Sequence, residues 1–347
     1  MLYVAVALAF ALSILLTPLV KKFAVAIGAT DTPDARKVHK KIMPRMGGLA
    51  IFLSFSIALI FTMPEGPYTW PILAGAGIII LTGALDDLFQ LPPKMKVLGQ
   101  LIAALIVILW GGVQVEFINL PFGGRLEFGY FSIPLTLLWI IGITNAINLI
   151  DGLDGLAAGV SSIALLTISI MAMIMGDAYV MIFGSILAAS TIGFLFYNFH
   201  PAKIFMGDTG SLFLGFMISV LALLGFKNIT VISLLIPILI LGVPISDTFF
   251  AIIRRIVNKQ PISAPDKSHL HHCLLNAGFS HKETVLVIYG IAIMFSMSAF
   301  IFSQSTLWGA LLVIAVVLAA LGLIVESVGL LGKDQKPFIN FVRSRGK

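Results

Sequence analysis

The sequence predicts an all-α, polytopic integral membrane protein with about eleven transmembrane helices. Of the 347 residues, 59% are hydrophobic and 11% are charged, whereas about 25% of a typical soluble domain is charged. Apolar segments long enough to cross a bilayer recur along the whole chain, with short polar connections between them. No repeat or low-complexity linker separates them, so we expect a single membrane domain over 1–347.

The expected spans begin near the first residue. Leu2 to Val20 has no basic segment before it and no small-residue cleavage site, so we expect a retained span and not a cleaved signal. The single cysteine, Cys273, excludes an internal disulfide. The eleven apolar segments are 2–20, 47–63, 70–85, 97–113, 131–150, 157–176, 178–197, 210–226, 230–256, 284–303 and 306–329.

Basic residues predict the orientation of these spans. If the amino terminus is outside, only Arg125 and Lys227 of the 22 Lys and Arg residues lie in outer connections, as the positive-inside rule favours. The net charge of +6 then needs no nucleic-acid partner, because orientation and attraction to membrane lipid explain it. The cytoplasmic connections are 21–46, 86–96, 151–156, 198–209, 257–283 and the tail after 330.

The two faces of the membrane differ in their expected content. On the outer face, Val115 to Gly129 alternates apolar and polar residues around a Gly-Gly turn, which is typical of a small β-hairpin. The loops rich in carboxylates or histidines all fall on the cytoplasmic face. We therefore expect the functional site on cytoplasmic loops.

The stretch TNAINLIDGLDGLAAG follows a long apolar run. Asn145, Asn148, Asp151 and Asp154 recur in it every three residues, close to the helical period, and would form one polar ribbon. Polar groups this dense beside a membrane-length segment are costly unless they bind something. The simpler alternative is a polar helix end with acidic residues in a turn.

Acidic residues also follow the third span. Asp86 and Asp87 are adjacent, and Lys94 and Lys96 come after a proline pair. Adjacent carboxylates can hold a divalent cation or accept a proton, and lysines suit phosphate. Solvated acids at a membrane surface are the alternative.

The loop YNFHPAKIFMGDTGS carries another acid, Asp208, just before an expected helix start. Asp208 could cap that helix or bind a metal ion. Phe205 could stack on a flat ring or pack against neighbours.

Three histidines, His269, His271 and His272, lie within four residues of the connection 257–283. They could suggest zinc, but no cysteine or carboxylate partner has an appropriate spacing, and the flanking charges favour anion recognition. Asp247 lies inside the ninth span, where an acid either is functional or has a structural partner nearby.

Together these groups predict an enzyme that handles a phosphorylated nucleotide substrate with Mg²⁺, against a second substrate in the membrane. Mn²⁺ is the ion expected to substitute. A transporter or flippase for an anionic substrate is the alternative from another class, although transporters usually place such groups near the bilayer midplane.

Four motifs in this order resemble those of the polyprenyl-phosphate N-acetylhexosamine 1-phosphate transferases of glycosyltransferase family 4. They are DDLFQLPPKMK, NAINLIDGLDGLAAG, FMGDTGS and PDKSHLHH, spread over residues 86 to 272. The resemblance is greatest to the bacterial undecaprenyl-phosphate GlcNAc-1-phosphate transferases that start teichoic acid or O-antigen synthesis. The translocase that loads phospho-MurNAc-pentapeptide is a more distant relative.

The resemblance implies roles for the matching residues. Asp208 and Asn148 would hold the Mg²⁺ that bridges the UDP pyrophosphate. Asp86 and Asp87 would be the catalytic pair, with Asp86 the base that readies the lipid phosphate. The implied substrate-binding residues are Lys96 on a phosphate, Phe205 on uracil, Asn198 beside the uridine, Asp151 and Asp154 without separate roles, and His269, His271 and His272 over the sugar phosphate.

The implied reaction transfers GlcNAc 1-phosphate from UDP-GlcNAc to undecaprenyl phosphate, giving undecaprenyl-diphospho-GlcNAc and UMP. It would start a cell-envelope polysaccharide such as wall teichoic acid, in the bacterial cell (inner) membrane, in a homodimer. Another UDP-N-acetylhexosamine or UDP-MurNAc-pentapeptide remains an alternative donor. An aspartate nucleophile with a covalent phospho-enzyme is the alternative mechanism.

Overall fold

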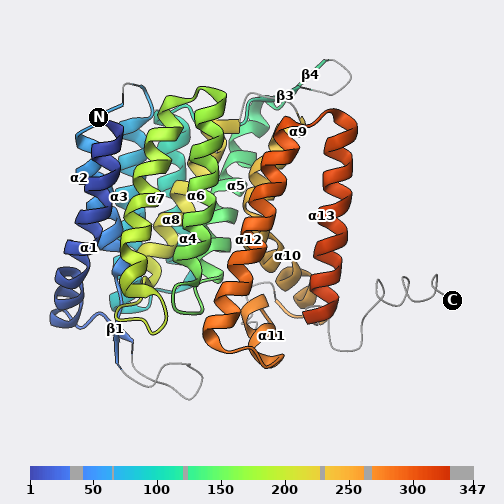
Figure 1. Cartoon of the computed structure of the whole chain (residues 1–347). Helices are drawn as coiled ribbons and strands as arrows, with labels where there is room; N and C mark the ends of the chain where they lie inside the picture. The colour runs from blue at the N-terminus through green and yellow to red at the C-terminus, as the bar shows by residue number, and fades with distance from the viewer. Residues whose placement is uncertain (32–41, 65, 120–123, 227–230, 262–267, 329–347) are drawn as a thin grey trace.

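The computed structural model describes residues 1–31, 42–64, 66–119, 124–226, 231–261 and 268–328. Its helices stand side by side in one bundle (Figure 1), as the all-α prediction requires. The helices are α1 (Leu2–Ala26), α2 (Gly47–Ile60), α3 (Thr69–Phe89), α4 (Pro93–Leu105), α5 (Ser132–Leu149), α6 (Leu156–Met175), α7 (Ala178–Asn198), α8 (Gly207–Phe226), α9 (Val231–Ile240), α10 (Gly242–Val257), α11 (Leu270–Asn276), α12 (His281–Gln304) and α13 (Leu307–Val328).

Nine helices in the described ranges are long and apolar enough to cross a membrane. They match nine of the eleven expected spans; α4 reaches that length with the π-helical turn Ile106–Trp110. The second expected span is the 14-residue helix α2, and the ninth is divided into α9 and α10 at Leu241. Pro244 lies in the first turn of α10, where its missing N–H costs nothing, so the break falls just before it.

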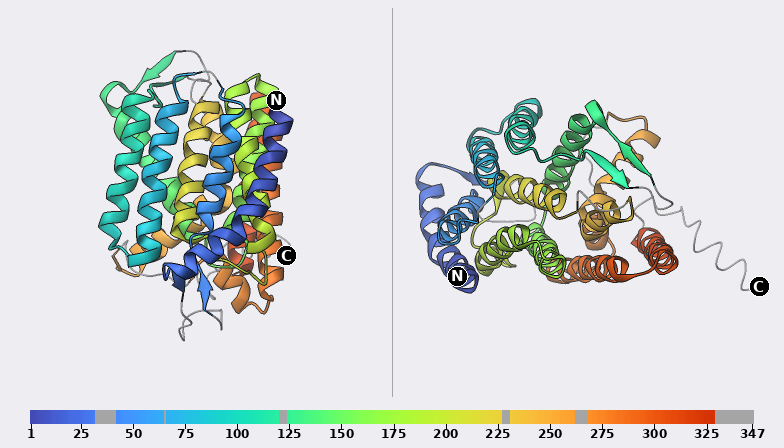
Figure 2. Two further views of the ribbon diagram at one scale, coloured as in Figure 1. Left: turned by 90° about the vertical axis from the view of Figure 1, so that its left-hand side faces the viewer. Right: turned by 90° about the horizontal axis from the view of Figure 1, so that it is seen from above.

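Helix α8 forms the centre of the bundle. Nearly all of its residues are buried, and it contacts α2, α3 and α5 among others. Figure 2 (right) shows it, in yellow, with helices on both sides. Glycines permit this packing, because a Cβ on Gly48 would overlap the backbone of Gly210 and one on Gly83 would lie 2.5 Å from the Cα of Thr209. The first turn of α8 is therefore held close to α2 and α3.

Two small antiparallel strand pairs lie at opposite ends of the bundle (Figure 1). The predicted hairpin is confirmed: β3 (Phe117–Asn119) pairs with β4 (Arg125–Glu127). The second pair, β1 (Thr30–Asp31) with β2 (Met43–Pro44), was not expected from the sequence. Figure 2 (left) shows this pair, in blue, at the end of the bundle away from the hairpin.

Some sequence predictions fall outside the described residues. They concern residues 32–41 of the connection 21–46, residue Lys227, the charges that flank the histidines, and the tail.

Candidate functional site

Four helix ends bring the predicted acids and lysine together at the β1 end of the bundle. Asp86 lies near the end of α3, Lys96 in the first turns of α4, Asn148 at the end of α5 and Asp208 in the first turn of α8. The chain reverses tightly between α3 and α4. Gln90 adopts a left-handed backbone, and α4 begins at Pro93, whose fixed φ suits a first helical position.

Lys96 is shared by two carboxylates. Its Nζ donates to Asp86 Oδ2 at 3.1 Å and to Asp208 Oδ2. Asn148 Nδ2 donates to Asp208 Oδ1 at 3.1 Å and to Ser211 Oγ at 2.8 Å. The carboxylate of Asp208 is thus held by a cation on one oxygen and an amide on the other.

Asp87, the other member of the acidic pair, faces the backbone of α8. It accepts the N–H of Asp208 at 3.0 Å on one oxygen, and the N–H and hydroxyl of Thr209 at 3.0 and 2.6 Å on the other. A carboxylate that accepts from the first N–H groups of a helix caps it and suits its dipole. The geometry of Asp87 is therefore that of a residue that positions Asp208.

Arg45 reaches the same group from a distant part of the sequence. Its Nε lies 3.6 Å from Asp87 Oδ1. Backbone bonds hold it there: the N–H of Phe205 donates to Pro44 O at 2.9 Å and that of Gly47 to Phe205 O at 3.0 Å. Burial works against its charge, but Asp87 and further carboxylates outweigh burial and raise the pKa of Arg45.

Asp151 lies in the loop between α5 and α6, where the charge of Asp208 acts on its carboxyl group. Burial, and then the charge of Asp208, raise the pKa of the Asp151 carboxyl to about 7. Asp151 is thus the fourth carboxyl group around two basic side chains, Lys96 and Arg45. Carboxyl groups thus outnumber basic side chains here, and a divalent cation would favour the charged form of the carboxyls.

The donor set fits Mg²⁺. Carboxylate and amide oxygens are the ligands that this ion takes, usually through one or two carboxylates together with substrate phosphates. Asp208 and Asn148 offer those groups from two rigid helix ends, and Asp86 lies on the other side of Lys96. Asp208 and Asn148 are therefore the groups that would hold Mg²⁺ here.

The side chains of the polar ribbon predicted from Thr144 to Gly159 contact different segments: α8, α4 and the α7–α8 loop. Asn148 faces α8, whereas Asn145 Nδ2 donates to Gln100 Oε1 of α4 at 2.7 Å. Asp154, beyond the helix end, accepts the N–H of Ala202 at 3.0 Å and pairs with His200 Nδ1 at 2.9 Å. We name Asp86, Lys96, Asn148 and Asp208 the acid–lysine centre. The helical period therefore placed only part of the ribbon at this centre.

Asn198 braces two loops. Its Oδ1 accepts the N–H of Gly155 at 3.1 Å, and its Nδ2 donates to Ile204 O at 3.0 Å. Phe205 is half-buried, and its backbone joins the loop before α8 to β2 and α2. The contact of Asn198 and Phe205 with a nucleoside stays a prediction.

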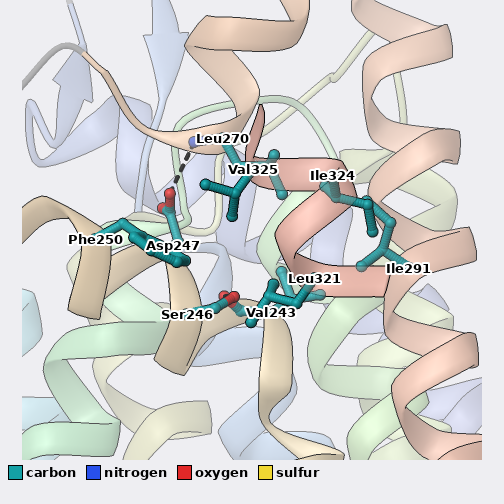
Figure 3. Close-up of a pocket in the computed structure, with 9 residues that line it drawn as sticks. All are labelled: Val243, Ser246, Asp247, Phe250, Leu270, Ile291, Leu321, Ile324 and Val325. Atoms are coloured by element: carbon teal, nitrogen blue, oxygen red, sulfur yellow. Dashed lines mark hydrogen bonds between the residues drawn. The ribbon is translucent and has the colours of Figure 1, made fainter. Parts of the chain in front are cut away.

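The histidine loop forms the short helix α11 at the same end of the bundle (Figure 1). His269 Nδ1 lies 2.8 Å from Asp247 Oδ2, and the N–H of Leu270 donates to Asp247 Oδ1 at 2.7 Å. Figure 3 shows the second bond beside a small apolar pocket between α10, α12 and α13. Asp247 therefore has a structural partner nearby, His269, which is one of the two alternatives that the sequence left open.

His271 packs onto the α5–α6 loop. A Cβ on Gly152 would lie 2.5 Å from its Nε2, so only glycine leaves room there. Burial and the neighbouring His272 lower the pKa of His271 to about 3, so its ring is neutral at physiological pH. The rings of His271 and His272 have centroids 4.2 Å apart. The role of these histidines over a sugar phosphate stays a prediction.

Comparisons with known proteins show the family of this chain. Residues 69–226 fit the family model described as glycosyl transferase family 4. A probable undecaprenyl-phosphate N-acetylglucosaminyl 1-phosphate transferase of Bacillus subtilis (strain 168) is 54% identical over 95% of this chain and 93% of that protein. The chain belongs to glycosyl transferase family 4.

Two more distant relatives carry other names. A decaprenyl-phosphate N-acetylglucosaminephosphotransferase of Mycolicibacterium smegmatis is 35% identical over 78% of this chain and 74% of that protein. A phospho-N-acetylmuramoyl-pentapeptide-transferase of Halalkalibacterium halodurans is 32% identical over 84% of this chain and 94% of that protein. The family match includes α3 to α8, the helices that supply the acid–lysine centre.

The sequence does not single out several residues that lie around this centre. Arg45 counts there only among the basic residues that predict orientation, and its contact with Asp87 has no signal in the sequence. Thr209 and Ser211 follow Asp208 by one and three residues in the FMGDTGS motif, and this spacing is the available signal. Nothing in the sequence marks His200 itself as a residue of a functional site.

Proposed function

We propose that the protein transfers GlcNAc 1-phosphate from UDP-GlcNAc to undecaprenyl phosphate and releases UMP. The observation that carries this proposal is Lys96 shared between Asp86 and Asp208, with Asn148 on the second oxygen of Asp208. A lysine between acids that can take Mg²⁺ suits a pyrophosphate. The name of the Bacillus subtilis relative, similar along almost the whole chain, supports the GlcNAc donor and the undecaprenyl acceptor.

In this proposal, Asp208 and Asn148 hold Mg²⁺. The ion would neutralise charge on the pyrophosphate and on the departing UMP. Asp87 does not need to touch the substrate, because its bonds to the first turn of α8 fix the carboxylate of Asp208 in place. Lys96 and Arg45 would then orient phosphate oxygens that replace the carboxylates as their partners.

The transfer is a displacement at phosphorus. A phosphate oxygen of undecaprenyl phosphate bonds to the β-phosphorus of UDP-GlcNAc, the bond from that phosphorus to the bridging oxygen breaks, and UMP leaves with the bonding electrons. Asp86 is the proposed base for any proton on the lipid phosphate. The covalent alternative uses an aspartate as nucleophile; inversion at a chiral β-phosphorus supports direct attack, and retention supports the covalent route.

We also propose that the site faces the cytoplasm. The distribution of Lys and Arg supports this orientation, and the acid–lysine centre lies at the end away from the predicted outer hairpin. Synthesis of a cell-envelope polysaccharide such as wall teichoic acid is the proposed use of the product. The homodimer stays a prediction.

The test is UMP release by the purified protein with undecaprenyl phosphate and a panel of UDP-sugars, with Mg²⁺ or with EDTA. We expect release with UDP-GlcNAc that requires both Mg²⁺ and the lipid phosphate. Release with UDP-MurNAc-pentapeptide instead would reassign the donor. Folded protein that releases no UMP from any donor would overturn the proposal and return transport to consideration.

A further inference from the structure

A second group of polar side chains lies outside the acid–lysine centre. Asp154 comes from the α5–α6 loop, His200 from the α7–α8 loop and His281 from the first position of α12. Each offers one ligand atom, and these atoms all lie within 4.8 Å of one another. We name these three residues the His–Asp–His cluster. Among the described residues, His269, His271 and His272, for which the sequence could suggest zinc, do not form such a group.

Both imidazoles direct a nitrogen at Asp154. His200 Nδ1 lies 2.9 Å from Asp154 Oδ2, and His281 Nε2 accepts the backbone N–H of Asp154 at 3.0 Å. The two rings stack, with centroids 4.2 Å apart and 23° between their planes. An acceptor nitrogen carries no proton, so His281 already has the lone pair that a metal ion needs.

Ions in solution can reach this cluster. The side chain of His200 is 39% exposed and that of Asp154 is 16% exposed. His281 is also partly exposed, at the start of its helix. The cluster is therefore open on one side, in contrast to His269 and Asp247, whose side chains are 7% and 2% exposed.

The chemistry of the ligands selects the ion. Two imidazoles and one carboxylate suit Zn²⁺ and its neighbours in the first transition row, whereas Mg²⁺ prefers oxygen ligands. Sites with two histidines and one carboxylate leave a further position for water. The acid–lysine centre offers no imidazole and would select Mg²⁺, so one chain can hold two different ions at the same end.

We propose that Asp154, His200 and His281 bind one divalent transition-metal ion, Zn²⁺ being the ion expected in the cell. The ion takes the place of the proton shared by His200 Nδ1 and Asp154 Oδ2, which is released to water. It also takes the His281 lone pair that now accepts from the Asp154 N–H. Because each lone pair lies in its ring plane, the rings must turn out of their stack to reach the Zn–N distance of about 2.0 to 2.1 Å.

Such an ion joins three segments that otherwise meet here through hydrogen bonds and the stacked His200 and His281 rings. The α5–α6 loop carries Asp151 toward the acid–lysine centre, and α12 also holds this loop through the bond from Tyr289 Oη to Gly155 O at 2.5 Å. Occupation of the cluster therefore fixes the loop against α12. This inference goes beyond the proposed function and does not depend on the identity of the sugar donor.

The test uses Co²⁺ as a spectroscopic substitute for Zn²⁺. Full-length protein without a polyhistidine tag is titrated in detergent with Co²⁺ in an excess of Mg²⁺, which occupies oxygen sites. We compare the parent with His200→Asn and His281→Gln. The matched controls are His272→Gln, a neighbouring histidine outside the cluster, and Asp208→Asn, which alters the acid–lysine centre. Thermal unfolding with and without Zn²⁺ is measured on the same samples.

We expect one equivalent of Co²⁺ to give visible absorption bands that Zn²⁺ abolishes, in the parent and in both controls. His200→Asn and His281→Gln should lose the bands and the rise in melting temperature with Zn²⁺, because a ligand stabilises only the state that binds it. Folded parent protein without the bands would overturn the proposal. Bands that survive both histidine substitutions, or that disappear only in Asp208→Asn, would overturn it as well.

Discussion

The acid–lysine centre and the histidine helix α11 lie at the same end of the bundle but are paired in different ways. At the centre, Lys96 serves two carboxylates at once, and carboxyl groups outnumber the basic side chains. At α11, Asp247 is matched to His269, and His271 is a neutral ring packed onto Gly152. In our proposal, the unbalanced region exchanges its partners for a charged ligand, whereas the balanced region keeps its internal pairs.

The largest effect should come from Asp208→Asn. This change keeps the size of the side chain but removes the charge that holds Lys96 and the proposed Mg²⁺. We expect UMP release to fall by about 10³-fold, with a higher Mg²⁺ requirement. Initial rates over a range of Mg²⁺ concentrations check this.

Asp177→Asn is the matched control for that substitution. Asp177 caps α7 by accepting the N–H of Val180 at 3.0 Å, away from the acid–lysine centre, so its loss of charge should leave the rate within about twofold. Equal losses in the two variants would show that the unbalanced charge at the centre has no special role.

Lys96→Gln should have the next largest effect. Without the ammonium, phosphate oxygens lose a donor, and we expect kcat/KM to fall by about 10²-fold. The Mg²⁺ requirement should not rise, because the carboxylates lose a competing cation. Lys94→Gln, an exposed neighbour, provides the control for charge alone. A rise in the Mg²⁺ requirement of Lys96→Gln would contradict the proposed division of roles between Lys96 and Asp208.

Asp247→Ala tests the balanced region through stability. The change removes the partner of His269 and the acceptor of the Leu270 N–H, so we expect a loss of about 3 kcal/mol. Thermal unfolding in detergent measures it. Asp177→Ala, which removes only a helix cap, should cost about 1 kcal/mol. If the two losses were equal, the Asp247 pair would contribute no more than an ordinary cap.

The smallest effect should come from Gly152→Ala. The new Cβ would meet Nε2 of His271 at 2.5 Å and displace the ring, while the acid–lysine centre stays intact. We expect KM for the sugar donor to rise by about threefold to tenfold with kcat nearly unchanged. Gly142→Ala on α5 has nothing within 4 Å and should change neither constant. A fall in kcat alone would contradict a positioning role for His271.

The sequence predicted that the residues of the acid–lysine centre share one end of the bundle, because its motifs lie at helix ends. Asp86, Lys96, Asn148 and Asp208 each follow or precede an apolar span, so the alternation of spans placed them on one face before any contact was known. It also predicted the hairpin, whose strands are local in sequence.

Contacts between distant segments could not be predicted in this way. The approach of Arg45 to Asp87 depends on backbone bonds between β2 and the loop before α8. The meeting of His200 with His281 depends on how α12 packs against α6. The resemblance makes Asp86 the base and assigns no separate role to Asp87, whose contact with the α8 N-terminus appears only in the structure.

The most direct test of the central claim is the binding of Mn²⁺, as a paramagnetic substitute for Mg²⁺, followed by electron paramagnetic resonance with UDP present. We predict one bound Mn²⁺ per chain that Mg²⁺ displaces, with affinity at least about 100-fold weaker in Asp208→Asn and unchanged in His281→Gln. Mn²⁺ binding that is equally tight in Asp208→Asn and in the parent would contradict the claim that the acid–lysine centre holds the ion.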